Sequence, residues 1–257
     1  MMNKRGQVTI FIIVGIVIVI SVFLIFYFLG DTLKRQSTPE VVLEESSLEP
    51  ITNLIEECVS NEIVKGVELV GLQGGYNNPP VYFQIGDYKL SYDCDKDESG
   101  IYINRLPTLN RISSEIEEYT SDNMNLIEEC IDNFKTYKDQ GYKINDGDMN
   151  INVEISDSIL VDVNYPVEVN RGDFTSSFNN FEFSIPSGLI NAYKVATDIV
   201  NDECTGTIFN IDDYIISNPP LSFIERQLSS DGKLFYYLTT IPQSGEDAYR
   251  FHFIVER

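Results

Sequence analysis

The sequence predicts an α+β protein with one N-terminal transmembrane helix followed by an extracytoplasmic domain. Three observations lead to this prediction. Residues 7–30 form a run of 24 residues without a charged side chain. Apolar residues then recur at helical spacing in two long stretches, and from Met149 onward they alternate with polar residues. We therefore expect two long helices and a hairpin, followed by antiparallel sheet with one further helix.

The apolar segment from Val8 to Leu29 is long enough to cross a membrane. At about 1.5 Å per residue its helix covers roughly 33 Å, against a hydrocarbon core of about 30 Å. A cleaved secretory signal has a shorter apolar stretch, of about 7–15 residues. We expect an uncleaved anchor that contacts membrane lipid, with residues 1–7 in the cytoplasm.

Charge and cysteine content indicate that the rest of the chain lies outside the cell. Basic residues flank the anchor on both sides, so they do not orient it by themselves. Residues 31–257 carry 16 of the 18 basic residues and all 40 acidic ones, a net charge of −24. This excess argues against nucleic-acid binding. Four cysteines lie there too, compatible with two disulfides in an oxidising compartment. They are Cys58, Cys94, Cys130 and Cys204.

The first half of the domain is expected to be mainly helical. After a polar tether over residues 30–47, apolar spacing predicts a helix from about 48 to 72, which glycines then end. Alternation over 81–92 predicts a hairpin with a two-residue Gly86-Asp87 link. Helical spacing returns over 109–138, where a bend is expected near Ser121-Asp122.

The second half is expected to be mainly antiparallel sheet with one wet face. Strand alternation runs from Met149 to Ile185, a helix follows at about 187–201, and two strands close the chain at roughly 234–241 and 248–255. The regions 48–145 and 146–257 form either one domain or two domains divided near Asn145.

A short repeat bears on the disulfide pairing. Residues 53–58 read Asn-Leu-Ile-Glu-Glu-Cys, and residues 125–130 repeat them exactly 72 positions later. Chain order favours the pairs Cys58–Cys94 and Cys130–Cys204. The repeat favours Cys58–Cys130 instead, because equivalent positions on packed helices can face each other. Sequence alone does not fix the connectivity.

The segment Lys4-Arg5-Gly6-Gln7-Val8-Thr9-Ile10-Phe11 resembles the class III signal of archaeal type IV pilin-like proteins. In that family a peptidase cuts after the glycine and leaves the apolar helix on the mature protein. The resemblance implies cleavage between Gly6 and Gln7. Pilins typically carry Glu at the fifth mature position, where this chain has Phe11.

A second resemblance covers residues 48–78, in which a helix with Cys58 leads into Gly71-Leu72-Gln73-Gly74-Gly75-Tyr76. This order is similar to that of a group of uncharacterised single-pass archaeal membrane proteins. The resemblance implies a class of protein and no activity. On their own, these glycines indicate a helix C-cap and a turn rather than a phosphate cradle, because phosphate-binding glycines open a helix.

A calcium loop begins with carboxylates at alternate positions, and the same spacing occurs here at Asp93, Asp95 and Asp97. The pattern then departs from an EF-hand, which requires Gly where Glu98 stands and a bidentate Glu where Asn104 stands. An ordinary acidic loop is the competing interpretation, so the three aspartates are a weak calcium candidate and no cofactor is expected.

No catalytic set can be assembled from the sequence. His252 is the only histidine, and strand alternation between Phe251 and Phe253 places it on a polar face. The cysteines lack the close spacing of a metal clamp. A carboxylate-pair hydrolase would need two converging acids, and nothing identifies them. We therefore expect a non-enzymatic protein.

The leading hypothesis is a binding or scaffold module at the cell surface, acting on a protein partner. The alternative is a structural, pilin-like filament subunit, which the Gly6-Gln7 signal supports. Phe11 opposes the alternative, and so does Pro39, which disfavours a helix running from the membrane into the domain.

Overall fold

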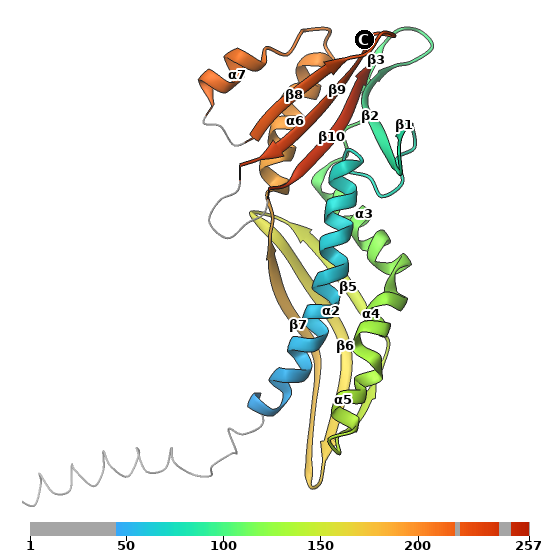
Figure 1. Cartoon of the computed structure of the whole chain (residues 1–257), viewed down its shortest axis with the longest axis vertical. Helices are drawn as coiled ribbons and strands as arrows, with labels where there is room; N and C mark the ends of the chain where they lie inside the picture. The colour runs from blue at the N-terminus through green and yellow to red at the C-terminus, as the bar shows by residue number, and fades with distance from the viewer. Residues whose placement is uncertain (1–44, 219–221, 242–247, 257) are drawn as a thin grey trace, which may run out of the picture. The chain divides into compact units, whose positions relative to one another are not determined.

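The computed structural model describes residues 45–218, 222–241 and 248–256 and confirms the α+β class (Figure 1). The predicted signal and transmembrane segment, including Gly6, Gln7 and Val8 to Leu29, lies outside the described residues. Among the helices that are described, none combines the length and the apolar character that a membrane span needs. Residues Leu48–Arg257 form one compact unit.

The first long helix is α2, Glu45–Leu72. Its apolar stripe, which includes Ile55, Val59 and Ile63, is fully buried in the main core. Three strands follow, and the first two pair through the Gly86-Asp87 link, with Gly86 at a positive φ of 59°. The strands are β1 (Tyr82–Ile85), β2 (Tyr88–Lys96) and β3 (Tyr102–Asn104).

The helix expected over 109–138 is broken into short pieces. α3 ends at Asp122, one residue before a C-cap at Asn123, close to the expected bend. A second break lies at residues 132–134, all of which have positive φ. The apolar spacing continues across both breaks because apolar residues on either side of them stay buried, among them Ile116, Ile127, Ile131 and Phe134. The pieces are α3 (Leu109–Asp122), α4 (Met124–Ile131), the 3-10 turn η1 (Asp132–Phe134) and α5 (Lys135–Lys138).

A four-stranded antiparallel sheet follows, with β6 at its centre. β4 and β5 pair with one side of β6 and β7 pairs with the other. Alternate residues of β6 are buried, and α2 and α3–α5 lie over that face (Figure 1). The strands are β4 (Lys143–Asp146), β5 (Asn150–Ile155), β6 (Ser158–Arg171) and β7 (Phe174–Pro186).

The C-terminal segments complete the other sheet, in the order β1-β2-β10-β9-β8 with β3 beside β2. Helix α6 covers one face of this sheet (Figure 1). β2 and β10 are parallel, so the regions 48–145 and 146–257 share one sheet. The elements are α6 (Leu189–Glu203), α7 (Ile211–Ser217), β8 (Ser222–Leu228), β9 (Lys233–Thr240) and β10 (Arg250–Glu256).

Two disulfides are present, and their pairing corrects the one that chain order favours. Cys58 bonds to Cys130, with Cα atoms 5.7 Å apart, and Cys94 bonds to Cys204, with Cα atoms 5.8 Å apart. The repeat interpretation is confirmed for the first pair, since its equivalent positions on α2 and α4 face each other. The second pair joins β2 to the end of α6, which packs on the same sheet.

Candidate binding pocket

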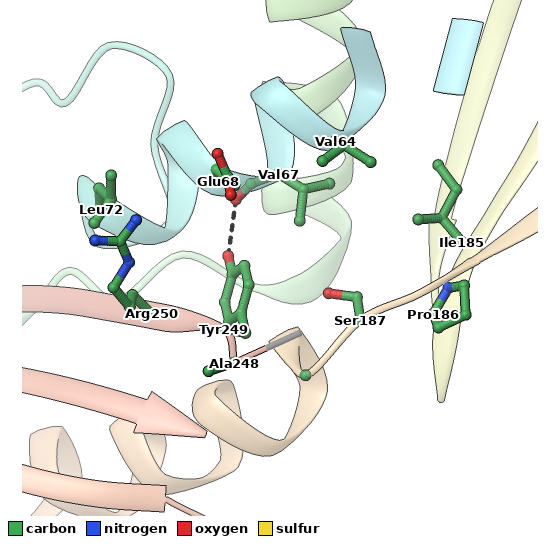
Figure 2. Close-up of a pocket in the computed structure, with 11 residues that line it drawn as sticks. Val64, Val67, Glu68, Leu72, Ile185, Pro186, Ser187, Ala248, Tyr249 and Arg250 are labelled. Carbon is green, nitrogen blue, oxygen red and sulfur yellow. Dashed lines mark hydrogen bonds between the residues drawn. The ribbon is translucent and has the colours of Figure 1, made fainter. Parts of the chain in front are cut away.

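One recess lies where the C-terminal half of α2 meets the start of β10 and the segment between β7 and α6 (Figure 2). Its volume is about 220 Å³. Ligand pockets for cofactors and drug-sized molecules typically measure about 300–1,000 Å³. The size therefore suits one or two side chains. The lining residues are Val64, Val67, Glu68, Leu72, Ile185, Pro186, Ser187, Gly188, Ala248, Tyr249 and Arg250.

Tyr249 holds the wall of the pocket in place. Its hydroxyl donates to the carbonyl oxygen of Val67 at 3.0 Å (Figure 2). Its backbone N–H donates to the Thr240 hydroxyl oxygen at 2.8 Å, and its carbonyl accepts the Thr240 N–H at 2.8 Å. Burial raises the pKa of the Tyr249 phenol, and the Glu68 carboxylate raises it further. The phenol thus stays neutral and keeps its donor.

Two glycines allow the three segments to meet. A Cβ at Gly71 would lie 2.3 Å from the carbonyl oxygen of Arg250 and 2.4 Å from the Tyr249 hydroxyl. A Cβ at Gly188 would lie 2.5 Å from the Thr240 hydroxyl oxygen. All three distances are too short for a real side chain. The first glycine of the Gly-Leu-Gln-Gly-Gly-Tyr run is therefore a packing residue.

The other two glycines of that run end α2, as expected. Gly74 and Gly75 have φ values of 70° and 91°, and the Gly75 N–H donates to the Val70 carbonyl at 2.6 Å. The buried Gln73 fixes the turn that follows. Its amide donates to the Asn77 carbonyl at 2.7 Å, and its side-chain oxygen accepts the Lys89 N–H at 2.8 Å. The loop links α2 to the hairpin.

The mouth of the pocket carries both signs of charge, while its inner wall is apolar. Glu68 and Arg250 are exposed at the rim, and Val67 and Leu72 are buried beneath them. Val64 is 39% exposed, which leaves part of an apolar side chain open to solvent. The arrangement fits an apolar group that is flanked by polar or charged atoms.

The three calcium candidates have separate contacts. Asp93 is fully buried and accepts a hydrogen bond from the Ser91 hydroxyl, and burial raises its carboxyl pKa well above the usual value. Asp95 accepts a hydrogen bond from Arg105 Nε at 2.8 Å. Asp97 caps the turn before β3 and accepts from the Ser99 hydroxyl at 2.7 Å, which lowers its pKa. Within the described ranges, no three His, Cys, Asp or Glu side chains cluster to suit a metal.

Glu203 is a buried acid that the sequence did not identify. Glu203 is completely buried near the end of α6, where it accepts the Tyr236 hydroxyl at 2.7 Å and the Phe209 N–H at 3.0 Å. Arg226 lies 3.9 Å away and partly balances its charge. Phe209 follows α6 closely, but Tyr236 and Arg226 lie on the later strands β9 and β8, so no local pattern indicates these two partners. The contacts join α6 to β9 and β8.

His252 lies on the sheet face opposite α6, between the buried Phe251 and Phe253. It is only partly exposed because its ring packs edge-on against Tyr237, with centroids 5.0 Å apart. Burial lowers its pKa to about 4, with a contribution from Arg250. The imidazole is accordingly neutral at physiological pH.

Comparison with known proteins does not place this chain in a family. No protein-family model, curated protein or solved structure matches this chain.

Proposed function

We propose that this chain is a membrane-anchored extracytoplasmic protein that binds a protein partner at the cell surface. The observation that carries the proposal is the preformed apolar pocket between α2 and β10, with Glu68 and Arg250 at its mouth. The partner presents one apolar side chain, flanked by polar groups that meet the two rim charges. Aromatic and aliphatic anchors that enter such pockets supply much of the binding energy in protein interfaces.

The two disulfides and the apolar segment support the location. Disulfides persist in oxidising compartments and are rare in the cytosol. The described domain contains two of them, and Val8 to Leu29 is long enough to act as the anchor. Protease treatment of intact cells tests this placement. We expect digestion of residues 31–257 without lysis; protection until lysis contradicts it.

The binding role is tested with a photo-crosslinking residue at position 64, in living cells. Val81 is the matched control, since it is 40% exposed against 39% for Val64 and does not line the pocket. We expect a discrete crosslinked species from position 64, diminished by Arg250→Glu and absent from position 81. Equal crosslinking from both positions, or none from position 64, refutes the pocket as the binding site.

The alternative function is a pilin-like structural subunit. The resemblance of residues 4–11 to a class III signal favours it. Mass spectrometry of purified surface filaments distinguishes the two functions. Filament subunits that begin at Gln7 support the structural role, whereas recovery of the chain from membranes alone supports the binding role.

A further inference from the structure

Strand β7 forms one edge of the four-stranded sheet over its full length of 13 residues (Figure 1). Within the described parts of the chain its backbone pairs with β6 alone. Most strands in globular proteins have about 5–6 residues, and a long uncovered edge is a template for pairing with another strand.

The opposite edge of the same sheet is covered along β5, and its other strand, β4, has only four residues. Helix α3 packs against β5, and the Glu117 carboxylate accepts the Val153 N–H at 2.8 Å. The edge strands of the other sheet are short: β8 has seven residues and carries Glu225 and Arg226, β1 has four residues and β3 has three. Short length and charge are common protections of an edge strand. β7 has 13 residues and carries a single charge, Glu182.

β7 is also nearly free of charge, in a chain whose net charge is −22. Glu182 is its only ionisable residue, and its only proline is Pro186 at the end. Two copies of so acidic a chain repel each other over most of their surfaces. An uncharged strand is the place where this repulsion is weakest.

The pattern of β7 is symmetric about its centre. Read outward from Asn179-Asn180, each half begins with a phenylalanine, Phe178 in one direction and Phe181 in the other. Half-buried residues alternate with exposed ones in both halves, and the alternation reverses phase at the two asparagines. The half-buried positions are Phe174, Ser176, Phe178, Phe181, Phe183 and Ile185.

This symmetry fits antiparallel pairing of β7 with a second β7. With Asn179 opposite Asn180 of the second copy, Phe178 lies opposite Phe181, and each half-buried residue meets another. A twofold axis repeats every contact, as in an isologous dimer. Aromatic cross-strand pairs of this kind stabilise a sheet. We propose that two copies associate through β7, joining their sheets into one continuous eight-stranded sheet.

The single charge is compatible with this register. Glu182 faces Ser177 of the second copy, five residues from the other Glu182 along the strand. At about 3.4 Å per residue the two carboxylates are roughly 17 Å apart, beyond the screening length of about 8 Å. Their repulsion is therefore small.

The first test uses the full chain in mild detergent and measures mass by sedimentation or native mass spectrometry. Asn179→Lys/Asn180→Lys gathers four ammonium groups at the twofold axis, and we expect it to leave only monomer. Asn150→Lys/Asn152→Lys is the matched control, with the same two changes at exposed positions of β5, and it should retain the dimer. Thermal unfolding checks that both variants fold.

The second test addresses the register. Ser177→Glu places a like charge opposite Glu182 twice in each dimer, and we expect about tenfold weaker association. Adding Glu182→Lys should restore it. Three results overturn the proposal: a wild-type chain that stays monomeric at about 100 μM, a dimer that survives Asn179→Lys/Asn180→Lys, and a monomer in which the β7 amides that face away from β6 resist hydrogen exchange. The last result would show that another segment of the same chain pairs with the β7 edge.

Discussion

Removal of the Cys94–Cys204 bridge is the perturbation with the clearest expected magnitude. The bond closes a separation of 110 residues between β2 and the end of α6. In the chain-entropy model, a loop of this length stabilises the folded state by about 4.8 kcal/mol at 25 °C. We expect Cys94→Ala/Cys204→Ala to lower the free energy of unfolding by up to about this amount, and by at least about 2 kcal/mol.

The second bridge provides the comparison. Cys58–Cys130 closes 72 residues, which corresponds to about 4.4 kcal/mol. The two closed segments overlap along the chain, so their contributions are not additive. A domain of ordinary stability unfolds at a cost of about 5–15 kcal/mol. Loss of both bridges should leave the protein marginally folded or unfolded at 25 °C.

The assay is urea unfolding followed by circular dichroism, on the wild type and the two double variants. Each variant should show a lower midpoint. It should also show a larger urea dependence, because the unfolded chain is more expanded without the cross-link. A loss below about 1 kcal/mol for Cys94→Ala/Cys204→Ala would refute the reasoning.

The connectivity itself is tested by tryptic digestion without reduction. Lys65 lies between Cys58 and Cys94, Arg105 lies between Cys94 and Cys130, and Lys135 lies between Cys130 and Cys204. Trypsin therefore separates all four cysteines, and each possible pair has its own mass. Recovery of Cys58 linked to Cys94 would contradict the structure.

Three further predictions concern single residues. Burial raises the folded-state pKa of Asp93, so the ionised carboxylate lowers the stability of the fold as pH rises above about 4. Asp93→Asn should therefore raise the free energy of unfolding, measured in urea, by about 1–3 kcal/mol at pH 7 and by little at pH 4. Gly71→Ala should destabilise by about 1–3 kcal/mol, because its Cβ meets the Arg250 carbonyl, whereas Gly147→Ala, with only ordinary contacts, should change the melting temperature little. Proton NMR of His252 should give a pKa of about 4. Because only the unfolded chain binds the proton between about pH 6.5 and 4, the free energy of unfolding should fall as pH falls through this range. A titration midpoint near 6.5 would show that the imidazole ring is exposed.

Sequence periodicity predicts those elements whose buried face is decided locally. The spacing of Ile55, Val59 and Ile63 follows the buried face of α2, and the alternation of residues 159–169 follows that of β6. Such patterns do not detect a change of helix direction. Residues 132–134 adopt positive φ while Ile131 and Phe134 both stay buried, so the apolar spacing continues through the break.

Elements that depend on distant partners were not predicted. β8 carries Glu225 and Arg226 and is mostly exposed, so it forms a strand by pairing with β9 rather than by its own pattern. The parallel pairing of β2 with β10 joins residues about 160 positions apart. The pocket likewise draws its walls from three remote segments. Gly71 was the one sequence feature that pointed to the pocket, because its packing requires a glycine. Judged from its neighbours in sequence alone, this glycine is interpreted as the end of a helix.

The pocket and the β7 edge place different demands on the fold. The walls of the pocket lie on elements that the disulfides hold, since Cys58 ties α2 to α4 and Cys94 ties β2, the neighbour of β10, to α6. A recess that exists before binding avoids the cost of ordering its own side chains when a partner arrives. The β7 edge needs no such recess, because backbone groups supply the contacts and a second strand completes them. The preformed recess therefore suits the recognition of a different protein, and the self-complementary strand suits association with a second copy.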